Sequence, residues 1–202
     1  MFYPIMIDIN DKDIVVVGGG EVAYRKSVKL LEFGANIKIL SPIKIDKFVE
    51  LKEIYNEKLN FICNVYEKEY VEKAFLVVAA TSSKEVNQQI SKDCKDLKIL
   101  ANIVDSREDS DFITPSIINN DDLVISISTM GSFPYLSKKI RIDMEENYKK
   151  FNKEYMNILE KIRITILKQY KDKTKEIMNL ALELDIEGLK DLLIELESGT
   201  FK

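Results

Sequence analysis

IVVVGGGEVAYRK, residues 14–26, is the stretch that decides the fold class. Its four β-branched apolar residues, with no polar alternation, predict a buried parallel strand, and the glycines predict a tight turn at the strand's end. Gly18, Gly20 and Ala23 fit the G-x-G-x-x-G/A spacing of a dinucleotide-binding turn. In such a turn the first glycine permits the bend, the second admits a pyrophosphate, and the small third residue allows close helix packing. The pyrophosphate would lie at the N-terminus of the following helix.

Glycine turns between a strand and a helix also occur without a ligand, so the prediction of a dinucleotide site depends on the elements that flank the turn. Residues 21–33 predict an amphipathic helix that ends at Gly34, and residues 36–40 predict a second short strand. Together with the turn they form a βαβ unit. Ser41 follows the second strand, at the place where many such sites hold a ribose with Asp or Glu. The residues therefore leave the choice between NAD and NADP open.

Strands and helices continue to alternate as far as Asp105, which predicts a doubly wound parallel sheet. The predicted strands are 61–65, 75–80 and 99–104, and the predicted helices are 46–55 and 82–96. Ser82 and Glu85 have the spacing of a capping box at the start of the second of these helices.

Polar residues stand directly after several predicted strands. Ser41, Thr81 and Asp105 occupy such positions, and ligands of doubly wound sheets bind beyond the carboxyl ends of the strands. With the glycine turn they predict one common site. The chain contains no histidine, which excludes imidazole as a general base and every triad that contains it. Asp105 is the best-placed base, and a turn or capping role is the alternative for this residue.

The pattern changes after Asp105. Residues 112–118 and 123–128 predict a β-hairpin, which could pair with a second copy in a homodimer. A helix is predicted from Pro134, with Lys138, Lys139 and Arg141 as a basic cluster that either meets an acidic ligand or forms a solvated face. From residue 151 onward, apolar residues at helical spacing predict a helical domain with its own core. The apolar positions are Tyr155, Leu159, Ile162 and Ile166, then Ile177, Leu180, Ala181 and Leu184, then Leu189, Leu192, Leu193 and Leu196.

The predicted class is thus α/β: a Rossmann-like doubly wound sheet (1–111), a hairpin or dimerisation region (112–149) and a C-terminal helical domain (150–202). A formal net charge of −4 disfavours a nucleic-acid partner. No long apolar span or leader segment is seen, so we expect a cytoplasmic protein without a membrane partner. The two cysteines, Cys63 and Cys94, have no paired spacing, and no metal site is predicted.

Four separated segments together resemble the precorrin-2 dehydrogenase family, the NAD-dependent module at the N-terminus of bifunctional siroheme synthases. They are VVGGGEVAYRK, AATSSKEVNQQI, NIVDSREDSDFITPSII and SISTMGSFP, within roughly Pro4 to Arg141. The resemblance implies oxidation of precorrin-2 to sirohydrochlorin with NAD in siroheme or cobalamin synthesis, and in some members insertion of Fe²⁺ as a second substrate. It also implies a homodimer formed through the hairpin region.

The resemblance also assigns roles to individual residues. It implies cofactor contacts at Glu21, Val22, Pro42 and Ile43, and matches Asp105 to the family's proposed catalytic aspartate. The other predicted cofactor-binding residues, Gly18 and Gly20 from the turn spacing and Ser41 and Thr81 from the strand ends, come from the residue pattern itself. The tetrapyrrole substrate carries many carboxylates, which favours Ser128, Lys138 and Arg141 as substrate-binding residues. Many members have Ser-Pro where this chain has Phe133-Pro134, so the hydroxyl-rich loop departs from the family here. Two alternatives stay open: a chelatase-only homologue, and a non-catalytic module that senses NAD.

Overall fold

The structure is a computed structural model that describes residues 2–120 and 122–201. The chain divides into two compact units, Met1–Thr114 and Pro115–Lys202. The three-part division at 111/112 and 149/150 stays a prediction.

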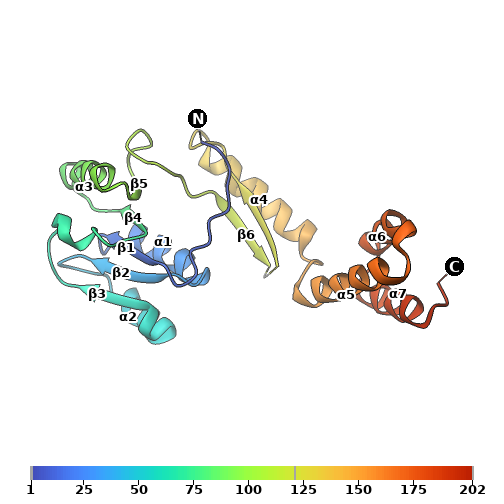
Figure 1. Ribbon diagram of the computed structural model, residues 1–202. Helices are drawn as coiled ribbons and strands as arrows, with labels where there is room; N and C mark the ends of the chain where they lie inside the picture. Colours follow the sequence, from blue (N-terminus) through green and yellow to red (C-terminus); the bar gives the residue numbers. More distant parts are fainter. Residues whose placement is uncertain (1, 121, 202) are drawn as a thin grey trace. The chain divides into compact units, whose positions relative to one another are not determined.

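The first unit is a parallel five-stranded sheet with helices on both faces (Figure 1). Its strand order is β3-β2-β1-β4-β5, so the strand that precedes the glycine turn lies at the centre. The strands are β1 (Asp13–Val17), β2 (Asn36–Leu40), β3 (Leu59–Ile62), β4 (Leu76–Ala79) and β5 (Leu100–Ile103). The helices are α1 (Glu21–Glu32), α2 (Lys47–Tyr55) and α3 (Lys84–Leu97). This arrangement confirms the predicted Rossmann-like class.

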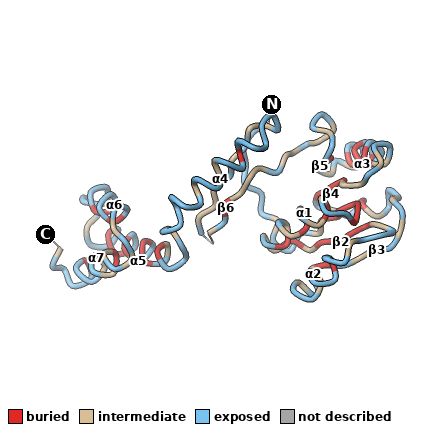
Figure 2. The backbone as a smooth tube through the Cα atoms, turned by 180° about the vertical axis from the view of Figure 1, so that it is seen from behind, coloured by how far each residue is buried: buried red, intermediate tan, exposed pale blue. Residues whose placement is uncertain are grey.

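Strand β1 is apolar at every position from Ile14 to Val17 because both of its faces are covered by helices. Ile14 and Val16 pack into a core with residues of α1 and α2, whereas Val15 and Val17 pack into a second core with residues of α3. All four side chains are at most 2% exposed. Figure 2 shows buried stretches along these central strands. A polar residue on either face of β1 would therefore be buried without water.

Helix α3 begins one residue later than the capping-box spacing predicted. Ser83, not Ser82, is the N-cap, and its Oγ accepts a hydrogen bond from the Val86 N–H at 3.2 Å. Glu85 accepts from the same hydroxyl at 2.7 Å. The capping-box prediction at Ser82 is wrong because either serine has an acidic residue near the right spacing, and only the backbone direction at the end of β4 selects between them.

Ser83→Ala is expected to lower the free energy of unfolding by about 1 kcal/mol, because a helix N–H loses its acceptor. Ser82→Ala is the matched control and should change the free energy by less than about 0.5 kcal/mol, because this serine is exposed. Urea unfolding of both variants measures the difference. Equal effects would contradict the assignment of the cap.

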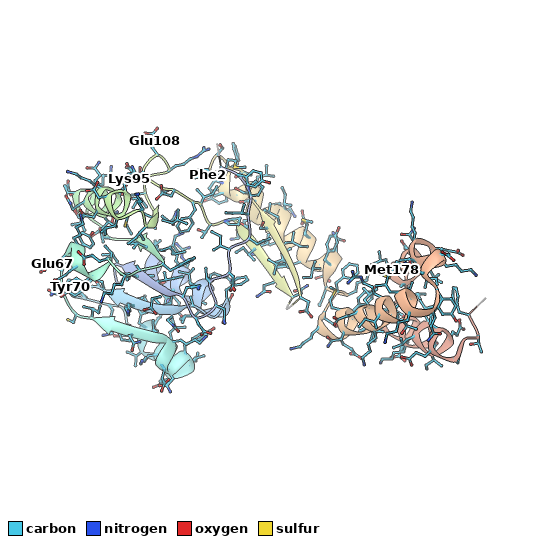
Figure 3. The ribbon with its side chains drawn as sticks, in the orientation of Figure 1. Phe2, Glu67, Tyr70, Lys95, Glu108 and Met178 are labelled. Atoms are coloured by element: carbon cyan, nitrogen blue, oxygen red, sulfur yellow. The ribbon has the colours of Figure 1, made fainter. Side chains whose placement is uncertain are left out.

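The polar run after β5 covers the open edge of the sheet. The carboxylate of Asp111 accepts from the Ala101 N–H at 3.0 Å, and the hydroxyl of Ser110 accepts from the Ile103 N–H at 2.8 Å. These side chains replace the missing neighbour strand. Glu108, labelled in Figure 3, lies at the outer end of this loop. The expected strand 112–118 is wrong at its start, because the Phe112 carbonyl accepts from the Asn102 side chain and Phe112 packs against the first unit's core.

Within its described residues, 115–120 and 122–201, the second unit contains an antiparallel hairpin, four α-helices and a short 3-10 helix, η3 (Lys171–Lys173). Its elements are β6 (Ser116–Asn120), β7 (Leu123–Ile127), α4 (Pro134–Tyr148), α5 (Lys153–Gln169), α6 (Thr174–Glu183) and α7 (Ile186–Ser198). Pro134 is at the first position of α4, as predicted. The apolar stripes of α5 and α7 form one core with α6, but Leu180, predicted to belong to it, is 44% exposed. Among the described residues, no helix combines the length and apolar character needed to span a bilayer.

Candidate dinucleotide site

The glycine turn between β1 and α1 is held by two neighbouring segments. Gly18 has φ +119°, a left-handed conformation, and a side chain there would collide with the Ala80 carbonyl. Gly19 is buried, and a side chain there would collide with the Ile43 carbonyl. The Gly19 carbonyl also accepts from the Ile45 N–H at 3.0 Å. The segments after β4 and after β2 thus close around the turn.

Gly20 faces open space instead. A Cβ built at this position meets nothing within 4 Å, and its φ of −91° is accessible to any residue. No side chain caps the N-terminus of α1, which starts at Glu21 and Val22. The first N–H groups of α1 thus carry no side-chain acceptor, and the helix dipole favours an anion there. The turn has the donors and the free approach that a pyrophosphate needs, so the residues fit a dinucleotide.

The loop after β2 forms one wall beside the turn. Ser41 Oγ donates to the Ile43 carbonyl at 2.6 Å, which bends the loop around Pro42 and leaves the Ile43 side chain 81% exposed. Lys47 Nζ and Glu21 Oε1 form an ion pair at 2.7 Å between this loop's helix and the start of α1. The predicted cofactor residues on both segments are thus brought together. Ser41 presents no carboxylate to a ribose.

Asp105 and Thr81 are joined by a residue that the sequence reading missed. Asn87 of α3 is 2% exposed, and its Nδ2 donates to Asp105 Oδ1 at 3.0 Å. Its Oδ1 accepts from Thr81 Oγ1 at 2.8 Å, and Nδ2 also donates to the Thr81 carbonyl at 3.3 Å. Asp105 itself is exposed at the end of β5. One signal could have revealed Asn87, since it shares the apolar face of α3 with Ile90 and Cys94 at helical spacing.

The predicted substrate residues lie in the second unit. Ser128 is exposed, and its Oγ accepts from the Met130 N–H at 3.0 Å. Arg141 pairs with Glu145, and Lys139 pairs with Asp143 along α4, whereas Lys138 is exposed. Two cations of the basic cluster thus have acidic partners on their own helix. The substrate roles of Ser128, Lys138 and Arg141 stay predictions.

Lys26 of α1 is a partly buried cation near the end of the first unit. Its Nζ donates to Thr114 Oγ1 at 2.6 Å. Burial lowers its pKa from 10.5 to about 8, and the charge of neighbouring Arg25 acts in the same direction. The native fold therefore carries a free-energy cost for holding this charge at neutral pH.

Lys26→Met is expected to raise the free energy of unfolding at pH 7 by about 1–3 kcal/mol, because the buried charge is removed. Below pH 8 both folded and unfolded wild-type chains hold the proton, so the cost is complete there. Between pH 8 and 10.5 the folded chain releases the Lys26 proton while the unfolded chain still holds it. The free energy of unfolding of the wild type therefore rises relative to that of the variant, and the difference between the two proteins shrinks. Denaturant unfolding across this range tests it, with exposed Lys29→Met as the control. A gap independent of pH would contradict the prediction.

A central strand, a glycine turn and an uncapped helix, at the point where the strand order reverses, define a Rossmann-like dinucleotide-binding protein. The chain belongs to the family described as "Putative NAD(P)-binding", whose model matches residues 5–116. The expected cofactor is thereby confirmed as a nicotinamide adenine dinucleotide.

Several siroheme synthases are similar to this chain. The siroheme synthase of Nitrosospira multiformis is 39% identical over 146 residues, which cover 71% of this chain and 31% of the relative. That of Photobacterium profundum is 31% identical over 144 residues, 71% of this chain and 30% of the relative. The chain thus spans about a third of the length of these curated relatives. The family resemblance seen in the four segments is confirmed.

A solved structure described as "SirC, precorrin-2 dehydrogenase" is similar over nearly the whole chain. It has a TM-score of 0.75 at 25% identity and covers 98% of this chain and 100% of its own. The match includes the hairpin and the C-terminal helices, which the family model does not reach. No cluster of three or more metal-binding side chains occurs among residues 2–120 and 122–201.

Proposed function

We propose that the chain oxidises precorrin-2 to sirohydrochlorin with NAD as the electron acceptor, as a step in siroheme or cobalamin synthesis. The observation that carries the proposal is the position of Asp105. Its exposed carboxylate follows β5, and Asn87 ties it to Thr81 beside the glycine turn. A dehydrogenase needs a base beside its cofactor site, and an exposed carboxylate next to the glycine turn supports this role for Asp105.

The reaction removes two hydrogens from the macrocycle. When bound, the nicotinamide would supply the acceptor for one of them as hydride. The other leaves as a proton, and Asp105 accepts it at a carboxylate oxygen. The N–H groups at the start of α1 would hold the pyrophosphate, with Glu21 and Val22 supplying backbone contacts. Exposed Ile43, beside Pro42, would offer an apolar surface to the adenosine end.

Support for this substrate comes from the relatives. The names siroheme synthase and precorrin-2 dehydrogenase belong to those proteins. The precorrin-2 dehydrogenase structure matches 98% of this chain, so the match extends well beyond the NAD(P)-binding region at residues 5–116. Insertion of Fe²⁺ into sirohydrochlorin is a further step open to the same site. The tetrapyrrole would supply the nitrogen ligands, and Asp105 would accept the pyrrole protons.

An anaerobic assay tests the proposal. Precorrin-2 generated in situ is mixed with the purified chain and NAD or NADP, and sirohydrochlorin and NADH absorbance are followed with and without Fe²⁺. Coupled growth of both signals supports the dehydrogenase, and a further iron-dependent change above the protein-free rate adds the chelatase. NAD binding without any turnover would favour the sensing module. Iron insertion without oxidation would favour the chelatase-only homologue.

A further inference from the structure

We propose that Asn87 is the positioning residue for Asp105, and that it fixes the orientation of this carboxylate relative to Thr81. The inference rests on the proposed function for its catalytic meaning. Its structural basis is independent: one buried carboxamide joins the segment after β4 to the segment after β5.

The hydrogen bonds of Asn87 leave its side chain one orientation. Nδ2 donates to Asp105 Oδ1 at 3.0 Å and to the Thr81 carbonyl at 3.3 Å. Oδ1 accepts from Thr81 Oγ1 at 2.8 Å and from the Thr81 N–H at 3.3 Å. A flipped amide would place its oxygen against two acceptors, so both ends of the group specify the same rotamer. With 2% exposure, water does not replace these partners.

Asp105 depends on this contact for its orientation. Its backbone lies in the turn after β5 and its side chain is exposed, so packing alone does not hold the carboxylate. The Asn87 amide holds Oδ1, which leaves Oδ2 free to accept a proton. Loss of the Asn87 donor would let the carboxylate rotate away from the cofactor side. Misplacement of about 1 Å can reduce a rate by about 10²-fold.

Thr81 gives Asn87 a second role. The same carboxamide accepts hydrogen bonds from the N–H and the hydroxyl of Thr81. Thr81 follows β4, the strand that pairs with β1 and so lies beside the glycine turn. The Asn87 carboxamide therefore holds both Thr81, a predicted cofactor contact, and Asp105, the proposed base. Asn87 acts through these two residues and not on the substrate itself.

Asn87→Asp tests the proposal in the full-length chain. The variant keeps the size of the side chain but replaces the donor to Asp105 by a second carboxylate, so kcat for NADH formation should fall about 10- to 100-fold. The KM for NAD should change less than about threefold, because a carboxylate oxygen can still accept from the Thr81 N–H and hydroxyl and because the pyrophosphate contacts lie on α1. Since a shared proton can restore the missing hydrogen bond, activity should partly recover as the pH is lowered.

Gln89→Glu is the matched control. It makes the same amide-to-carboxylate change two residues along α3, where Gln89 Nε2 donates to Asp93 Oδ1 at 3.0 Å. The control should keep kcat within about twofold of wild type, because Asp93 lies in a separate contact with Tyr66. An equal loss in both variants would assign the effect to general damage of α3 and overturn the proposal.

The double variant Asn87→Asp/Asp105→Asn shows whether Asn87 acts through Asp105. If it does, Asn87→Asp should lower the kcat of the Asp105→Asn variant by less than about a further twofold. If the two residues acted independently, the fold-losses in kcat of the two single variants would multiply in the double variant. Full additivity would overturn the proposal.

A spectroscopic measurement separates this proposal from the proposed function. In the cofactor-free protein, the side-chain amide resonances of Asn87, assigned from their loss in Asn87→Asp, should shift in Asp105→Asn and not in Gln89→Glu. If the resonance shifts but the wild-type protein does not oxidise precorrin-2, the contact between Asn87 and Asp105 is supported and the proposed dehydrogenase function is rejected. An unshifted resonance would reject the positioning role even in an active enzyme.

Discussion

Asp105→Asn is expected to lower kcat for precorrin-2 oxidation by about 10²- to 10⁴-fold, the usual contribution of a general base. The variant keeps the size of the side chain and removes only its ability to accept the proton. NAD binding should remain within about twofold, because the glycine turn and the start of α1 are untouched. Steady-state NADH formation and NAD titration measure the two effects separately.

Glu108→Gln is the control for this prediction. Glu108 is an exposed carboxylate of the same loop, at its outer end (Figure 3), so its substitution removes an equal charge away from the site. Its activity should stay within about twofold of wild type. Normal NADH production by Asp105→Ala would show that the base lies elsewhere.

Alanine at the two adjacent glycines of the turn is expected to weaken NAD binding in both cases but to destabilise the fold at only one of them. Gly19→Ala should lower the free energy of unfolding by about 1–3 kcal/mol, because its methyl group would collide with the Ile43 carbonyl and force the loop after β2 outward. The Ile45 N–H would then lose its bond to the Gly19 carbonyl. NAD binding should be lost together with this stability.

Gly20→Ala should instead leave the free energy of unfolding within about 1 kcal/mol of wild type, since its methyl group would meet no protein atom within 4 Å. The methyl group would occupy the approach of the pyrophosphate, so NAD affinity should fall about 10- to 100-fold. Thermal unfolding and NAD titration of the two variants check the contrast. Unchanged NAD affinity in Gly20→Ala would contradict the placement of the pyrophosphate at this turn.

The predicted helix boundaries and strand ends show where sequence reasoning loses precision. The order of strands and helices up to β5 was predicted because each element has a local apolar pattern. The N-cap at Ser83 and the start of β6 at Ser116 were not, because they depend on how the chain leaves a neighbouring strand. Phe112 was predicted to begin the hairpin, yet its carbonyl and the side chains of Ser110 and Asp111 bond to the edge of β5.

The candidate site divides in the same way. Gly18, Gly20, Thr81 and Asp105 were predicted, since the carboxyl ends of parallel strands meet at one edge of a sheet. Asn87 was missed because a single polar residue within a helix has no motif of its own. Its role appears only when α3 packs beside the ends of β4 and β5.

By itself, the sequence determined the parallel sheet, the position of the cofactor turn and the family, because hydrophobic periodicity and short glycine spacing are properties of neighbouring residues. Tertiary structure alone decided that Gly19 must also be glycine and that Asn87 holds Asp105. Both depend on contacts between segments far apart in the chain: the loop after β2 closes on the turn, and α3 lies against β5. Such contacts follow from the packing of whole elements, which no local pattern records.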